Sequence, residues 1–373
     1  MKKNSIKGHV TRPIWFDNKT DTIQVIDQTL LPHELVVADL ENVDDVIYAI
    51  KEMFVRGAPL IGATGALGVY AAFLQDKDKN KAVSNDYLVN ECKRLKASRP
   101  TAVNLAFGVD YVLKKVLEYS SFEDRSRICL KAALEILEKE VDNCRAIGEN
   151  GFPIIEQISR QKQGKVVNIL THCNAGWLAC IEYGTATAPI YNAFEKGIDV
   201  HVWVDETRPL NQGSRLTAFE LLQKGVNHTI ITDNAGGHLM QHSLVDLVIV
   251  GTDRTTRTGD VANKIGTYLK ALAAKANNIP FYVALPSSTF DWEIRDGIKE
   301  IPIEERDPNE IRYVQGKDEK GNISKVLVPP EKSLAINHAF DVTPASLITG
   351  FITERGICRA LEKDILSLFP EKA

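Results

Sequence analysis

The sequence predicts an α/β protein in which a smaller, mainly helical domain with a small antiparallel sheet precedes a larger domain built on a parallel sheet. Helical spacing of apolar residues dominates the first 150 positions. After Gly164, short β-rich apolar runs alternate with helical segments, as in a parallel sheet covered on both faces. A chain of 373 residues is also long for one core. We therefore expect one domain at 1–150 and a second at 151–373.

The first 150 residues divide into two parts. Short alternating patches within residues 1–40 are punctuated by Pro and Asp, and they indicate a small antiparallel sheet. From Val43 to about Gly151 the periodicity is helical. Breaks divide this region into several helices, near Arg56-Gly57 and near Arg99-Pro100.

Five apolar runs, with helical segments between most of them, predict the parallel sheet of the second domain. The helical segments include Ser214–Lys224 and Val261–Asn277. Parallel sheets of this kind bind ligands at the carboxyl ends of their strands. The expected strands are Val166–Leu170, Val200–Val204, Thr229–Thr232, Leu247–Val250 and Phe281–Leu285.

Composition narrows the class of protein. The chain is 44% hydrophobic and 25% charged, and its net charge of −4 argues against general binding to nucleic acid or anionic membrane. We expect no membrane helix and no secretory signal, because no apolar run of sufficient length is apparent and the basic start is not followed by one. Six scattered cysteines indicate reduced thiols in a cytoplasmic protein: Cys92, Cys129, Cys144, Cys173, Cys180 and Cys358.

Four expected strand ends carry polar or glycine-rich segments. Each alone is equally well explained as a turn and a helix cap, since Asn, Asp and Gly favour such positions. All four fall on the same edge of one sheet, which favours a binding cleft. The segments are Thr171–Gly176, Asp205–Gly213, Asp233–His238 and Gly251–Arg254.

Two residues of these segments are candidates for chemistry. Cys173 follows a strand and precedes a helix whose N-terminus could stabilise a thiolate. Its neighbour His172 should point to the opposite side, so a Cys–His pair is not implied, and no Cys/His set has the spacing of a zinc site. Asp253 follows a buried run, where desolvation would favour a proton donor. A salt bridge with Arg254 or a helix-cap role explains Asp253 equally well.

An anion site is expected at Arg56–Pro59, just before a helix. The backbone amides of Gly57 and Ala58 would face the anion with the positive helix end behind them, and Arg56 adds a planar charged fork. Further positive charge would come from Arg99 and from Lys264, expected in the first turn of the helix after Asp253.

Glycines 62, 65 and 68 do not form a nucleotide-binding loop. Their spacing is not Gly-x-Gly-x-x-Gly, and no strand precedes them. They fall three apart on an expected helix, which indicates a close-packing face.

Assembled, these motifs resemble the methylthioribose-1-phosphate isomerase family, and the match runs through most of the chain. The motifs lie in the family's order. They are Arg56–Pro59, Arg99–Asn104, Thr171–Gly176, Glu206–Pro209, Gln212–Thr217, Asp233-Asn234, Gly259–Thr267 and Phe340–Pro344.

The resemblance implies a Rossmann-like second domain, a homodimer, and no cofactor or metal. It implies conversion of the small sugar phosphate 5-methylthioribose 1-phosphate to 5-methylthioribulose 1-phosphate, a methionine-salvage reaction. Cys173 and Asp253 match the catalytic positions. The substrate-contact positions are matched by Arg56, Gly57, Ala58, Arg99, Gln212, Asn263 and Lys264.

Alternatives remain open within and outside the enzyme class. Thr252, Thr255 and Thr258 depart from the family's usual motif around Asp253, and 5-deoxyribose 1-phosphate is a chemically similar substrate. Ribose 1,5-bisphosphate would need a second phosphate site. The regulatory subunits of the translation initiation exchange factor share the fold but generally lack the Cys and Asp pair. The hydrogen could move by proton relay or by hydride shift.

Overall fold

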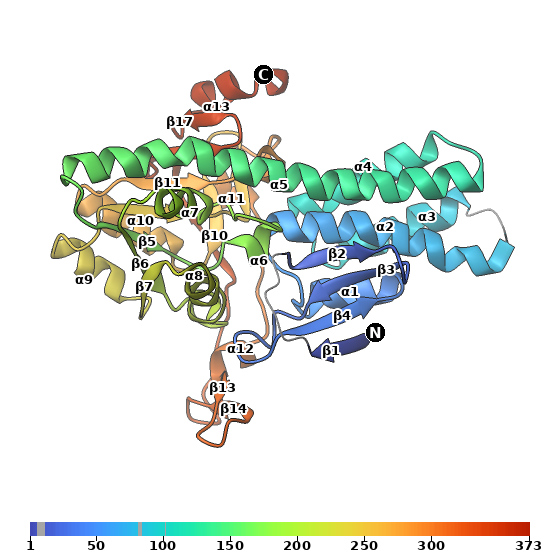
Figure 1. Cartoon of the computed structure of the whole chain (residues 1–373), viewed down its shortest axis with the longest axis horizontal. Helices are drawn as coiled ribbons and strands as arrows, with labels where there is room; N and C mark the ends of the chain where they lie inside the picture. The colour runs from blue at the N-terminus through green and yellow to red at the C-terminus, as the bar shows by residue number, and fades with distance from the viewer. Residues whose placement is uncertain (6–11, 81–83, 101) are drawn as a thin grey trace. The chain divides into compact units, whose positions relative to one another are not determined.

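The computed structural model describes residues 1–5, 12–80, 84–100 and 102–373, which form two compact units (Figure 1). Unit 1 contains Met1–Ala146, Gly176–Gly184 and Pro286–Thr289. Unit 2 contains Ile147–Ala175, Thr185–Leu285 and Phe290–Ala373. Each unit is therefore assembled from segments that are distant in the sequence.

Unit 1 begins with the small antiparallel sheet that the alternating patches predict. Its strands lie in the order β1-β4-β3-β2, and all three pairings are antiparallel. Alternate residues of β3, such as Ile23 and Val25, are buried against the helices. The strands are β1 (Lys2–Ser5), β2 (Ile14–Asp17), β3 (Thr22–Ile26) and β4 (Val36–Leu40).

Helices make up the rest of unit 1, and both expected breaks are confirmed, between the first two helices and between the third and fourth. The last helix ends at Gln161 rather than near Gly151. Pro153 lies inside it, and a proline removes only one backbone hydrogen bond while the buried Ile147 and Ile155 keep this stretch packed in unit 2. The helices are α1 (Val43–Lys51), α2 (Ala58–Asn80), α3 (Asn85–Ala97), α4 (Val103–Leu117) and α5 (Phe122–Gln161).

The glycines of α2 form the close-packing face that their spacing predicts. A Cβ on Gly62 would lie 2.8 Å from the carbonyl oxygen of Asn104, and one on Gly65 would lie 2.4 Å from Leu105 Cδ1. On the facing helix α4, a Cβ on Gly108 would lie 2.3 Å from the carbonyl oxygen of Gly62. The two backbones approach so closely that larger residues do not fit.

The same helix corrects the expectation that no apolar run reaches membrane-spanning length. Residues Ala58–Gln75 of α2 have a mean hydropathy of 1.3 over 18 residues, enough to cross a membrane by length and composition. However, 89% of this window is buried inside the structure. Burial of that extent is the pattern of a core helix, which is apolar all round because it is surrounded by protein.

Unit 2 is built on a seven-stranded sheet in the order β17-β16-β11-β8-β5-β6-β7, parallel except at β17. Numbered along the chain, its six parallel strands follow the doubly wound order 3-2-1-4-5-6. The α/β prediction is thus confirmed. The strands are β5 (Val167–Thr171), β6 (Val200–Asp205), β7 (Asn227–Ile231), β8 (Leu247–Val250), β11 (Phe281–Ala284), β16 (Gly350–Thr353) and β17 (Gly356–Cys358).

Helices cover both faces of this sheet. Adjacent strand residues Ile169 and Leu170 point into two different hydrophobic clusters. The first cluster includes residues of α5, α7 (Ala188–Glu195) and α8 (Ala218–Lys224), and a π-helical turn (Gly213–Thr217) precedes α8. The second cluster includes residues of α9 (Ala235–Gln241), α10 (Thr267–Ala276) and α13 (Glu362–Leu368).

A second small sheet corrects one sequence-based expectation. Val261–Asn277 was expected to be helical, but Val261–Lys264 forms β10 and the helix starts only at Thr267. The strand β10 pairs antiparallel with β15 (Phe340–Thr343), a partner far along the chain that local periodicity cannot reveal. The sheet order is β12-β9-β10-β15, with β9 (Arg254–Thr256) and β12 (Phe290–Asp291).

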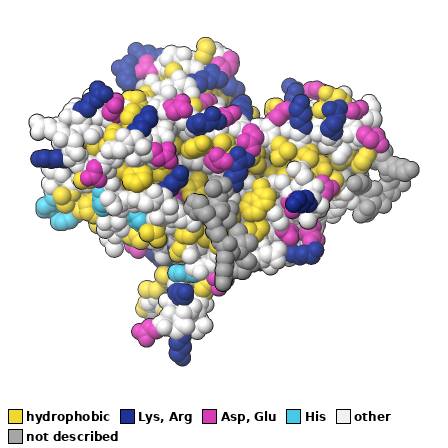
Figure 2. All heavy atoms as spheres, in the orientation of Figure 1, with side chains coloured by type: hydrophobic (Ala, Val, Ile, Leu, Met, Phe, Trp, Pro, Cys, Tyr) yellow, Lys and Arg dark blue, Asp and Glu magenta, His cyan; other side chains and the backbone are white. Residues whose placement is uncertain are grey.

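The remaining elements are short. The strands β13 (Tyr313–Lys317) and β14 (Ile323–Leu327) form an antiparallel hairpin. On the face drawn in Figure 2, acidic and basic side chains are interspersed, in agreement with the mixed charge of the sequence. The other helices are α6 (Trp177–Cys180), α11 (Gly297–Glu300), α12 (Asn309–Arg312) and 3₁₀ turns at Ser287–Thr289, Ala345–Leu347 and Pro370–Lys372.

Candidate active site

The candidate site of unit 2 lies where its sheet changes direction. Strands β5 and β8 are parallel neighbours although two strands, β6 and β7, separate them in chain order, so their carboxyl ends flank the topological switch point. Cys173 follows β5 and Asp253 follows β8. The two strand-end loops approach closely, because a Cβ on Gly251 would lie 2.6 Å from the Cβ of Ala175. Doubly wound sheets bind their ligands at this point.

Cys173 is held by its backbone in an unusual conformation. Its φ of 65° lies in the left-handed region, which costs a non-glycine residue about 1–3 kcal/mol. Two threonines fix it: its N–H donates to Thr207 Oγ1 at 2.8 Å, and Thr217 Oγ1 donates to its carbonyl at 2.6 Å. Thr207 in turn donates to the carbonyl of Asp205 at 3.0 Å. The side chain of Cys173 is 8% exposed.

A buried polar cluster supports the next residue along. Asn174 Nδ2 donates to Glu220 Oε1 at 2.9 Å, and the hydroxyl of Tyr191 donates to Glu220 Oε2 at 3.1 Å. Burial, and secondarily the charge of Glu220, raise the pKa of Tyr191 well above its ordinary value. The expected helix after Cys173 is only the four-residue α6, too short for a substantial helix dipole. Neighbouring hydrogen bonds, rather than a long helix, therefore order this loop.

Asp253 lies on a loop stabilised by the threonines that distinguish this chain. Its N–H donates to the carbonyl of Ala262 at 3.0 Å, and its side chain is partly exposed. Thr252 Oγ1 also lies 3.0 Å from the carbonyl of Ala262, and Thr255 Oγ1 donates to Thr252 Oγ1 at 3.2 Å. Arg254 Nη1 lies 3.5 Å from Asp291 Oδ2. The atypical motif thus forms a connected hydrogen-bonded turn.

Three predicted substrate contacts also belong to unit 2. Asn263 and Lys264 are buried on β10, so Lys264 lies at a strand end and not in the first helical turn as expected. Asn263 Nδ2 donates to Thr267 Oγ1 at 3.0 Å, and the Lys264 ammonium lies 4.9 Å from the ring centre of Phe340. The buried Oε1 of Gln212 accepts no hydrogen bond from any residue that the structure describes, which leaves it available to a ligand.

The other four predicted contacts belong to unit 1. Arg56 is buried, and Gly57 has a φ of 91° in close contact with Ala179, where an added Cβ would lie 2.5 Å from the alanine Cβ. Ala58 is the first residue of α2, and Arg99 lies partly exposed between α3 and α4. The 23-residue helix α2 starts directly after Gly57, so the helix N-terminus expected at this position is present.

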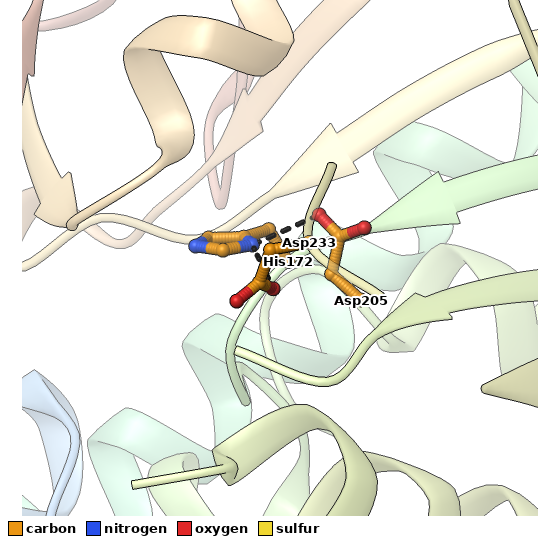
Figure 3. A group of neighbouring side chains, drawn as sticks. All are labelled: His172, Asp205 and Asp233. Atoms are coloured by element: carbon orange, nitrogen blue, oxygen red, sulfur yellow. Dashed lines mark hydrogen bonds and ion pairs between the residues drawn. The ribbon is translucent and has the colours of Figure 1, made fainter. Parts of the chain in front are cut away.

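Sequence reasoning missed a charged cluster formed around His172, the residue that precedes Cys173 (Figure 3). The carboxylates of Asp205 and Asp233 both face Nδ1 of His172, which lies 2.9 Å from Asp205 Oδ2 and 4.0 Å from Asp233 Oδ1. Lys270 Nζ lies 3.1 Å from the same Asp205 oxygen and donates to the carbonyl of Asp233. Both aspartates stand in the strand-end segments, but no sequence pattern indicates that Lys270 joins them.

The three acidic and imidazole groups of this cluster are close enough to be considered as metal ligands. One donor atom each from His172, Asp205 and Asp233 lie within 4.8 Å of one another. The Lys270 ammonium, however, already stands against Asp205 and supplies the positive charge that such a donor set attracts. The cluster is therefore interpreted as an internal ion network.

Comparisons with known proteins place this chain among close relatives. A family model described as the initiation factor 2 subunit family matches residues 54–360. The methylthioribose-1-phosphate isomerase of Desulfosudis oleivorans is 64% identical over 97% of this chain and 98% of the relative.

Two solved structures are similar over 97% of this chain. The 5-methylthioribose 1-phosphate isomerase of Pyrococcus horikoshii is 35% identical, with a TM-score of 0.81 and 96% of that chain covered. The translation initiation factor eIF-2B subunit delta from A. fulgidus is 37% identical, with a TM-score of 0.79 and 100% of that chain covered. The structural neighbours therefore carry the names of two different kinds of protein.

Proposed function

This chain belongs to the initiation factor 2 subunit family, and we propose that it is an aldose–ketose isomerase that converts 5-methylthioribose 1-phosphate to 5-methylthioribulose 1-phosphate. The 64% identity to a relative of that name, over nearly the full length of both chains, supports the proposal. The observation that carries it is the placement of Cys173 and Asp253 at the carboxyl ends of β5 and β8, on either side of the switch point.

The proposed chemistry moves one hydrogen between two carbons. Phosphate on the anomeric oxygen prevents spontaneous ring opening, so Asp253 donates a proton to the ring oxygen. Cys173, as a thiolate, then removes the proton from C2. The Cys173 thiol gives a proton to C1, and the Asp253 carboxylate takes the C2 hydroxyl proton as the C2 ketone forms, so both groups return to their starting states. Atoms balance, because substrate and product are isomers. Each acid or base role accelerates such a reaction by about 10²–10⁴. A direct hydride shift from C2 to C1 is the alternative.

Positively charged side chains and a helix N-terminus are proposed to bind the phosphate. Arg56 and the amides of Gly57 and Ala58 offer a charged fork and a helix N-terminus, and Lys264 and Arg99 add positive charge. Gln212, with its unpartnered amide oxygen, and Asn263 would contact the sugar hydroxyls.

Turnover of three substrates tests the proposal: 5-methylthioribose 1-phosphate, 5-deoxyribose 1-phosphate and ribose 1,5-bisphosphate. The highest kcat/KM is expected for the first. A higher kcat/KM for 5-deoxyribose 1-phosphate would instead identify the protein as a 5-deoxyribose 1-phosphate isomerase. No turnover of any of the three would instead favour a regulatory subunit. Running the reaction in D₂O separates the mechanisms, since deuterium at C1 of the product indicates a proton relay and its absence a hydride shift.

A homodimer is proposed as the assembly. Exposed apolar side chains gather in one segment of unit 2, which supports a protein–protein contact there. Light scattering on the purified protein should give about twice the chain mass of 41.4 kDa. A mass equal to one chain would contradict it. The exposed residues are Val326, Val328, Leu334 and Ile336.

A further inference from the structure

We propose that His172 is a positioning residue, a doubly protonated imidazolium that fixes the Cys173 loop against the segment carrying Asn263 and Lys264. The inference deepens the proposed function and rests on it for its kinetic consequence. The protonation state itself follows from the hydrogen-bond geometry and does not depend on which substrate is turned over.

Both ring nitrogens of His172 face hydrogen-bond acceptors. Nε2 lies 2.8 Å from the carbonyl oxygen of Ile265, and Nδ1 lies 2.9 Å from Asp205 Oδ2. A carbonyl oxygen and a carboxylate only accept hydrogen bonds, so both nitrogens must carry a proton to satisfy both contacts. A neutral ring has one protonated nitrogen and would leave one acceptor facing a lone pair. The ring is 1% exposed, so water cannot relieve that conflict.

Asp205, which accepts the hydrogen bond from Nδ1 of His172, also contacts a second cation. Lys270 Nζ lies 3.1 Å from Asp205 Oδ2, the same oxygen that faces the ring, so this oxygen accepts from the ammonium and from the ring. Asp205 is fully buried, and its Oδ1 accepts no hydrogen bond from the described residues. An isolated charge in that position would be very costly, and two cations around the one carboxylate stabilise it.

The charges that face the ring from other elements balance when the ring is cationic. Asp233, which follows β7, accepts from the N–H groups of Thr207 and Arg208 at 2.7 Å each, as expected of a carboxylate. Two aspartates, Lys270 and an imidazolium then sum to zero. Two further acids lie near this cluster: burial raises the pKa of Asp341, and burial together with Asp233 raises the pKa of Glu206.

The His172 ring lies where three segments of the candidate active site meet. His172 directly precedes Cys173 at the end of β5, Asp205 ends β6, and Ile265 directly follows Lys264. One side chain therefore joins three strand-end segments that carry proposed site residues. Gly266 leaves space for the His172 ring, because a Cβ at this position would lie 3.1 Å from the ring carbon Cε1. The φ of Gly266 is 102°, a conformation that also favours glycine.

The first test measures ring protonation directly. In full-length protein labelled with ¹⁵N-histidine, both nitrogens of His172 should show a directly bonded proton at pH 7.5, with the signals identified by their loss in His172→Asn. His201 serves as the internal contrast. Its Nε2 contacts Thr229 Oγ1 at 2.9 Å, its Nδ1 has no partner among the described residues, and burial lowers its pKa. A proton-free nitrogen in His172 at pH 7.5 would overturn the proposal, whatever the enzyme assay shows.

The second test separates positioning from simple structural support. His172→Gln and His172→Asn are each expected to lower kcat by about 10–100-fold and to change KM less than about threefold. The reason is that a displaced Cys173 is no longer aligned with the reacting carbon of the substrate, whereas the groups that bind the substrate stay in place. His201→Gln, in the same sheet, should keep wild-type kinetics. Wild-type kcat in both His172 variants would show that His172 does not position the Cys173 loop. Inactivity of the wild-type protein would instead refute the proposed function and leave the NMR result to decide the ring's state. If neither His172 variant folds, the ring signals are assigned from through-space contacts with Gly266, and the wild-type spectrum decides.

Discussion

At the scale of single residues, Cys173 differs from the chain's other thiols in what surrounds it. Its loop is held by Thr207 and Thr217, whereas Cys358 is packed in apolar surroundings that raise its pKa to about 12. We expect Cys173→Ser and Asp253→Asn each to lower kcat by about 10²–10⁴ with the fold intact, since each removes one acid or base role.

Steady-state kinetics and circular dichroism on the purified variants check this expectation. Cys358→Ser is the matched control and should keep the kcat of the wild type, because a thiol with a raised pKa is not a nucleophile at neutral pH. Near-wild-type turnover in Cys173→Ser or Asp253→Asn would show that the assigned chemical role is wrong.

Gly57 illustrates a second kind of residue-scale constraint. Its φ is 91°, and an added Cβ would lie 2.5 Å from the Cβ of Ala179. Gly57→Ala should therefore lower the free energy of unfolding by about 2–4 kcal/mol, from backbone strain and overpacking together. Gly164→Ala shares the positive φ but has nothing within 4 Å, so it should cost only about 1–2 kcal/mol. Urea denaturation of both variants compares them, and equal losses would contradict a steric role for Ala179.

The sequence located Cys173 and Asp253 because residues at strand ends follow from local patterns. It also predicted that His172 would not pair with Cys173, and both ring nitrogens do bind elsewhere. Its actual partners could not be predicted. Asp205 and Ile265 are 33 and 93 residues away, and only the strand order brings them to the ring.

At the scale of elements, tertiary pairing decides where local patterns mislead. The expected helix from Val261 begins as β10 because Val261–Lys264 finds a partner in β15, and this moved Lys264 from a helix to a strand end. Five of the seven strands of the main sheet were predicted within a residue or two, since continuous apolar runs are typical of fully buried parallel strands, whereas β16 and β17 were not predicted. Isolated helical periodicity could not reveal that α5 continues past Pro153.

A buried hydrogen bond joins helices α7 and α8, and its contribution to the free energy of unfolding should depend on pH. Tyr191 on α7 donates to Glu220 on α8, and Tyr191→Phe should cost about 1–3 kcal/mol of unfolding free energy at pH 7, because Glu220 stays buried with one donor fewer. The folded pKa of Tyr191 is raised above its unfolded value near 10. Its contribution is thus fully present below pH 10 and is lost as pH rises toward the folded pKa.

The stability gap between wild type and Tyr191→Phe should therefore narrow above pH 10, by about 1.4 kcal/mol per pH unit. Denaturation at pH 7, 10 and 11 measures the gap, and Tyr119→Phe, exposed on the surface, supplies a variant without a buried hydroxyl. A gap that stays constant with pH would show that Tyr191 ionises equally in both states.

At the scale of the whole molecule, the units do not follow the order of the chain. The segment Gly176–Gly184 follows β5 of unit 2 and yet belongs to unit 1, as does Pro286–Thr289. The chain passes between units directly after Ala175, two residues beyond Cys173. Composition and periodicity suggested two domains, but they carry no signal for such short excursions, because nine residues contain too few positions to reveal which core they join.

Two buried isoleucines that lie close in the sequence make this division testable. Ile181 packs in the core of unit 1, and Ile190 packs in the core of unit 2, both with no exposed surface. Changing either to Ala should cost about 2–5 kcal/mol. The cost should appear in different places: hydrogen exchange is expected to rise in α1–α4 for Ile181→Ala and in β5–β7 for Ile190→Ala.

Mass-spectrometric hydrogen exchange on the two full-length variants reads out both regions in one experiment. The matched substitution removes the same side-chain atoms, so a difference in location reflects only which core each isoleucine joins. If both variants raised exchange in β5–β7 alone, Gly176–Gly184 would belong with unit 2 in solution. In that case Gly57, whose close neighbour Ala179 lies in this segment, would lose the contact that now fixes the proposed phosphate loop.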